Sequence, residues 1–153
     1  MSADAKTTAS HLNNLIETCK DGQKGFEEAA GIVHCNDLKA ELQGLSRQRA
    51  EFATALQSEV SRLGVTPEKG GSIAGAIHRG WINLKTAMTS NDDQAVINEC
   101  ERGEDSAVAA YQEAMKADLA PQVTAMLSSQ YQKVKAAHDK IRDLRDSGKL
   151  QKA

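Results

Sequence analysis

The chain has 153 residues, a formal net charge of −2 and 26% charged residues of both signs, so no excess of positive charge draws it to nucleic acid or an anionic membrane. Aromatic residues make up 3% and there are only two prolines, a composition that favours helices and argues against β-sheet. No apolar stretch approaches the roughly 18 residues of a membrane span, and the N-terminal residues lack the apolar centre of an export signal. We therefore expect one all-α domain in the cytoplasm, with no nucleic-acid or membrane partner. Three cysteines without metal-type spacing should be reduced core residues: Cys19, Cys35 and Cys100.

Two helices are predicted in the first half of the chain. Apolar residues recur at steps of three and four from Leu12 to Val33, which indicates a packed helix over residues 5–33. Asn36 is a natural N-cap for a second helix over residues 37–63, which ends before a glycine. Because the link between them is short, the two helices should form an antiparallel hairpin.

A long connection follows the first hairpin. Residues 64–72 are rich in glycine and contain a proline, so they interrupt the helical pattern. A further helix is predicted over residues 73–89, crossing from one hairpin to the next. Trp81 should anchor this helix, which leaves His78 and Arg79 beside it as a candidate surface for a partner or ligand.

The second half of the chain predicts another hairpin. Asn91, Asp92 and Asp93, which can cap a helix and suit the positive end of the helix dipole, lie at the start of a helix predicted over residues 92–117. Pro121 then begins a fourth long helix over residues 121–147. The domain should cover residues 5–148, and residues 149–153 should form a frayed tail. The long connection between the hairpins permits a ferritin-like order of the four helices.

The two predicted hairpins are related in sequence. Shifting the chain by 81 positions places Cys19 on Cys100 and aligns ETCKDGQ with NECERGE. A shift of one more residue places Gln48 on Gln130. Matching motifs at a fixed spacing indicate that the hairpin is duplicated within the chain.

Each of the four apolar stripes is interrupted near its middle by one polar position, so these side chains should meet in one layer of the bundle. One interpretation is a buried hydrogen-bonded network that fixes the pairing of the helices, with Glu104 bonded to Arg49 or to glutamine amides. A carboxylate left without a partner there would instead bind a proton. In chain order the positions are Gln23, Gln48 or its neighbour Arg49, Glu104 and Gln130.

The alternative interpretation of this layer is a dinuclear metal centre. Such a centre takes a Glu from each of two helices and a Glu-x-x-His pair from each of the other two. Gln48 is followed three residues later by Glu51 and Gln130 by Lys133, so neither helix supplies the histidine. Neutral amides also cannot balance the charge of two metal ions. The sequence favours the network over bound iron or manganese, and the candidate metal ligands are Glu17, Glu51, Glu101 and Glu104.

The remaining histidines have ordinary interpretations. His11 lies near an exposed helix start, His34 lies in a turn beside Cys35, and His138 should lie at the edge of the core beside Asp139. No Ser/His/Asp or Cys/His spacing recommends a catalytic triad, so no catalytic residue is predicted.

The strings ETCKDGQ, QRAEF, AIHRGW, NDD and ECERGED occur in this order between Leu12 and Arg145. With them the chain resembles a bacterial ferritin-like family that carries only a domain-of-unknown-function label. The resemblance implies a ferritin-like four-helix fold and supplies no activity. The family tends to have a glutamate in the place of Gln23, and this departure removes a carboxylate from the predicted first helix.

These observations leave three hypotheses for the function. The favoured hypothesis is a non-enzymatic cytoplasmic bundle with a degenerate metal site, acting in protein association or stress physiology. The alternative from another class is a metal-dependent oxidase or iron-handling protein that uses an unusual set of glutamate ligands. The third is a homodimer that uses its helix surfaces as a scaffold.

Overall fold

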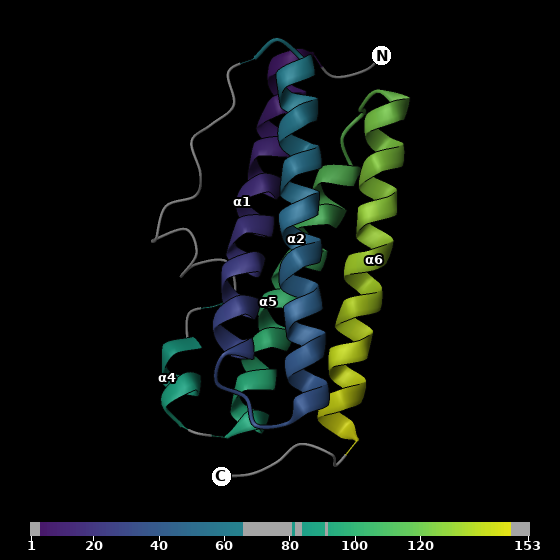
Figure 1. Ribbon diagram of the computed structural model, residues 1–153. Helices are drawn as coiled ribbons and strands as arrows, with labels where there is room; N and C mark the ends of the chain where they lie inside the picture. Colours follow the sequence, from purple (N-terminus) through teal and green to yellow (C-terminus); the bar gives the residue numbers. More distant parts are fainter. Residues whose placement is uncertain (1–3, 66–80, 82–83, 91, 148–153) are drawn as a thin grey trace.

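The computed structural model describes residues 4–65, 81, 84–90 and 92–147 of the chain. The described part is all-helical and contains no β-strand. Four long helices stand side by side, and a short one lies at one end of them (Figure 1). The helices are α1 (Ala5–Ala30), α2 (Asn36–Arg62), α4 (Leu84–Thr89), α5 (Asp93–Met115) and α6 (Pro121–Asp146).

The ends of the first two helices follow from local hydrogen bonds. The first helix ends at Ala30, three residues before the predicted end, because Gly31 caps it and donates its N–H to the carbonyls of Glu27 and Glu28. The predicted cap Asn36 is the first residue of α2, and the cap position belongs to Cys35, whose side chain makes no capping bond. Of the helix predicted over residues 73–89, the structure describes Leu84–Thr89 as helical, and residues 73–80 and 82–83 lie outside the described residues.

The four long helices form two antiparallel hairpins that pack against each other. In Figure 1, α1 and α6 run down the view while α2 and α5 run up. The first hairpin packs on the second through α1 against α5 and, more loosely, through α2 against α6. Each of these neighbouring pairs is antiparallel, an arrangement compatible with a four-helix bundle. None of the described helices is long and apolar enough to cross a membrane.

The buried apolar side chains form two clusters, one toward each end of the long helices. On α1, Cys19 belongs to one cluster and Phe26 to the other. On α5, the same division falls between Ala107 and Cys100. Glu104 on α5 lies between these positions, so a buried charge occupies the middle of the core.

A buried carboxylate fastens the second hairpin to the first. Asp93, the first residue of α5, is 1% exposed. Its Oδ1 accepts from the backbone N–H of His34 at 2.8 Å, and its Oδ2 accepts from that of Cys35 at 2.7 Å. Both donors lie just before α2, where backbone N–H groups lack helical partners and negative charge is favoured. Asp93 therefore holds the start of α2 in place of the predicted cap.

Candidate functional site

A buried ion pair joins α2 to α5 at the middle of the core. The guanidinium of Arg49 donates from Nη1 to Oε1 of Glu104 at 2.5 Å and from Nη2 to Oε2 at 2.7 Å. The side chains are 2% and 0% exposed. Burial alone would lower the pKa of Arg49, but the charge and hydrogen bonds of Glu104 more than offset this, and the net effect raises it. The pair is a fixed, two-pronged contact between opposite charges.

The guanidinium lies against an aromatic shell. The carbon at its centre lies 5.3 Å from the centroid of the Phe26 ring, within the range of a cation–π contact. Phe26 in turn meets Trp81 edge to face, with ring centroids 5.1 Å apart. Gly25 on α1 and Gly103 on α5 leave the space for this indole, because a Cβ at either position would collide with the ring. Trp81 is buried, and its ring lies against Phe26, Gly25 on α1 and Gly103 on α5.

A second buried polar group lies beside the ion pair. The hydroxyl of Tyr111 on α5 donates to Oε1 of Gln130 on α6 at 2.6 Å, and Sγ of Cys19 on α1 lies 3.3 Å from the same hydroxyl. Burial raises the pKa of the Cys19 thiol to about 11 and raises that of Tyr111 as well. Both groups therefore stay protonated at neutral pH, and the thiol is a weak nucleophile there.

The expected single layer is thus divided into two groups. Of the two alternatives on α2, Arg49 takes the inward position, and Gln48 is half-buried beside it with Oε1 accepting from Nε of Arg49 at 3.3 Å. Gln23 is also half-buried, and its backbone carbonyl accepts from the Ser46 hydroxyl at 2.9 Å. Gln130 on α6 accepts from Tyr111 on α5 and does not bond to the ion pair, because these two inward side chains meet each other in the core.

The candidate metal ligands do not come together. Glu51 is exposed on α2, Glu101 forms an ion pair with Arg145, and both oxygens of Glu104 accept from Arg49. Glu17 is half-buried on α1 and has contacts of its own. Among the described residues there is no group of three or more His, Cys, Asp or Glu side chains that could hold a metal ion. A ferritin-like dinuclear centre does not fit this donor set, since a guanidinium already neutralises the central carboxylate.

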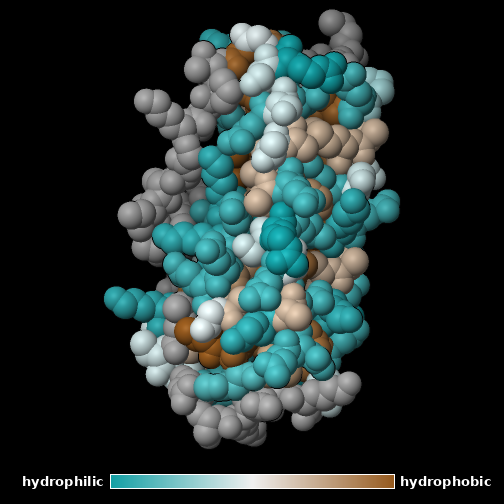
Figure 2. Space-filling view, in the orientation of Figure 1, coloured by the Kyte–Doolittle hydropathy of each residue, from teal (hydrophilic) through white to brown (hydrophobic). Residues whose placement is uncertain are grey.

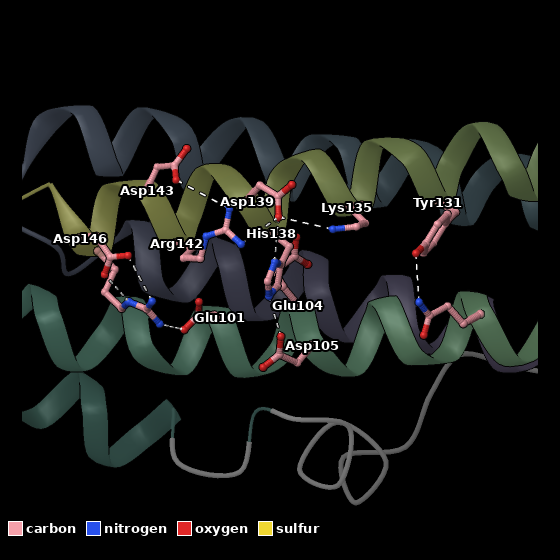
Figure 3. A network of polar contacts seen from close by, with 12 residues as sticks. Glu101, Glu104, Asp105, Tyr131, Lys135, His138, Asp139, Arg142, Asp143 and Asp146 are labelled. Atoms are coloured by element: carbon pink, nitrogen blue, oxygen red, sulfur yellow. Dashed lines mark hydrogen bonds and ion pairs between the residues drawn. The ribbon is translucent and has the colours of Figure 1, made fainter.

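Charged side chains also bridge α5 and α6 along their outer seam (Figure 3). Nε2 of His138 lies 2.6 Å from Asp105 on α5, and its Nδ1 lies 3.3 Å from Asp139 on its own helix. The hydrogen bond from His138 is the main cause that lowers the pKa of Asp139. Further along, Arg145 reaches Glu101 across the same seam. This seam is closed by paired charges, which the sequence did not predict because the partners lie far apart in the chain.

The remaining residues that the sequence analysis considered lie in different parts of the chain. His78 and Arg79 lie outside the described residues, whereas Trp81, predicted with them, is buried against α1 and α5. His11 is half-buried near the start of α1, and His34 is exposed in the α1–α2 link.

A family profile described as a domain of unknown function, DUF2383, matches residues 7–117. A search of curated proteins finds no match to the chain. The matched range includes α1 from its third residue onward, the whole of α2 and α5, and both members of the Arg49–Glu104 pair. Because the match covers more than half of the chain, the protein belongs to the DUF2383 family.

Proposed function

We propose that this chain is a cytoplasmic four-helix bundle of ferritin-like topology, built from a duplicated hairpin, that acts by protein association in stress physiology and not by metal chemistry. The antiparallel hairpins and the parallel course of α2 and α5 support the topology (Figure 1). The repeated Cys19 and Cys100, both buried, support the duplication.

The observation that carries this proposal is the bidentate contact of Arg49 with Glu104. A metal ion in the middle of such a bundle needs free carboxylate oxygens and net negative charge around it. Here the carboxylate is neutralised by a side chain that is always protonated, and the nearest amide, Gln48, is neutral. The positive charge that a metal would bring is supplied by the chain itself.

An internal ion pair of this kind is suited to a structural task. Two opposite charges on different helices can meet only in one register, so a slipped or reordered bundle would leave both buried without a partner. We infer that the pair fixes how the two hairpins dock. The function then belongs to the outer helix faces that this docking creates.

Metal analysis tests the proposal. The protein is purified without chelators from cells supplied with iron and manganese, and metal content and oxygen-dependent oxidation of ferrous iron are measured. Far less than one metal per chain and no oxidation above a protein-free control are expected. The matched variant is Glu104→Gln, checked for folding by circular dichroism. Near-stoichiometric metal in the native chain that is lost in this variant would overturn the proposal.

A further inference from the structure

We propose that the outer face of α2 and α6 is the interface of a two-fold homodimer. The inference deepens the proposed association role and rests on it, since it names the partner as a second copy of this chain. The starting observation is that α2 packs on α6 much more loosely than α1 packs on α2 or α5 on α6. A groove of about 250 Å³ runs along this seam. It is lined by Glu41, Leu45 and Gln48 on α2 and by Lys133, Ala136 and Lys140 on α6.

The charges along this groove are not paired within the chain. Among the described residues, the side chains of Glu41, Lys133 and Lys140 form no ion pair or hydrogen bond with one another or with any neighbour. The α5–α6 seam is the opposite case, because its charges are bonded across the helices, as His138 is to Asp105. The open seam thus presents one carboxylate on α2, that of Glu41, and two ammonium groups on α6, those of Lys133 and Lys140.

Symmetry makes this face complementary to itself. A two-fold axis parallel to the helices places α2 of one copy opposite α6 of the other. Since α2 and α6 are antiparallel, the eight residues from Glu41 to Gln48 then run alongside the eight from Lys140 to Lys133. Glu41 meets Lys140 of the second copy, and Gln48 meets its Lys133. Each contact occurs twice in the dimer.

The size of the face fits an interface of ordinary extent. A helix of 26 residues such as α6 is about 39 Å long at 1.5 Å per residue, and two helices side by side are about 20 Å wide. The face therefore offers on the order of 800 Å² per copy, which is the area of a standard interface. It is mostly hydrophilic, with small apolar groups between the polar ones (Figure 2). A reversible dimer sensitive to salt follows from this composition, in contrast to a permanent one.

Sedimentation velocity on the full chain, from micromolar to millimolar concentration, tests the inference. The chain of 16.4 kDa should convert to a species of twice that mass, and raising salt from about 0.1 M to about 1 M should weaken the dimer. Glu41→Lys and Lys140→Glu alone should each raise the dissociation constant at least about tenfold. Combined in one chain they should restore it, because each reversed charge then meets its complement again.

The controls separate this interface from a general effect of charge. Glu113→Lys on α5, at an exposed position away from the groove, should leave the dissociation constant unchanged. Circular dichroism checks that each variant is folded. A chain that stays monomeric up to millimolar concentration overturns the inference, as does a dimer that neither reversal weakens. Neither result affects the metal measurements, so the inference of a dimer can be wrong while the proposal of a metal-free bundle is still supported.

Discussion

Removing one member of the Arg49–Glu104 pair should be far more damaging than removing both. In Glu104→Gln the Arg49 guanidinium keeps its charge but loses the carboxylate, at a position 2% exposed to water. Breaking a buried pair in this way costs about 3–5 kcal/mol, a large part of the stability of a typical domain. The melting temperature should fall by about 6–20 °C, at about 2–4 °C for each kcal/mol in a chain of this size.

The double variant Arg49→Met with Glu104→Leu removes both charges and keeps similar volumes. It should lie within about 2 kcal/mol of the native chain or be more stable, because a well-packed apolar pair often replaces a buried ion pair without loss. Urea unfolding followed by circular dichroism gives the free energy of unfolding for the native chain, for Arg49→Met and Glu104→Leu alone, and for the double variant. Two single costs of at least about 3 kcal/mol each, with a double cost of at most about 2 kcal/mol, give an expected coupling energy of at least about 4 kcal/mol. Single variants that cost less than about 1 kcal/mol, or effects that simply add, would refute the reasoning.

Three further predictions concern the surroundings of this pair. In Gly25→Ala the new Cβ would lie 2.6 Å from the Trp81 ring, so the indole should move, its fluorescence should shift to longer wavelength, and stability should fall by about 1–3 kcal/mol. Gly44→Ala, with no atom nearer than 4.0 Å, is the matched control and should stabilise the chain by up to about 1 kcal/mol. Equal effects of the two substitutions would show that Gly25 is not needed to make room for the Trp81 ring. Asp93→Ala leaves two backbone N–H groups without their acceptor and should cost about 2–3 kcal/mol in urea unfolding, whereas an unchanged midpoint would show that the carboxylate is dispensable. With the pKa of its thiol raised to about 11, Cys19 should not react with a thiol reagent until the chain unfolds, and rapid labelling of the native thiol would contradict this. The free energy of unfolding should also fall as pH rises from 9.0 toward 11, because the thiol ionises first in the unfolded chain.

The helices could be predicted from the spacing of apolar residues, because a stripe at steps of three and four describes one helix without reference to any other. The exact rotation of each helix about its own axis could not be predicted in this way. Gln48 and Arg49 fit the stripe of α2 equally well, since Leu45 and Phe52 can be joined through either position. Only the packing of α2 against α5 makes Arg49 the inward residue and brings it to Glu104.

The spacing of apolar residues could not predict contacts between helices that are far apart in the sequence. Cys19 was predicted as a core residue and Gln130 as a polar position of the middle layer, but the pattern gave no sign that Tyr111 contacts both side chains. Asp93 was expected at a helix start for its charge, yet its carboxylate holds the start of another helix. In each case the side chain's partner depends on how the hairpins dock, which local periodicity does not specify.

Nuclear magnetic resonance of the Arg49 side chain during titration with Mn²⁺ examines the middle of the core most directly. A guanidinium held by Glu104 should give slowly exchanging Nη–H signals, and these should vanish in Glu104→Gln. If the chain supplies its own positive charge there, stoichiometric Mn²⁺ leaves these signals sharp and unshifted. If a metal ion binds in the core, the paramagnetic ion broadens the Arg49 and Glu104 signals at one equivalent, and the account of a metal-free centre is contradicted.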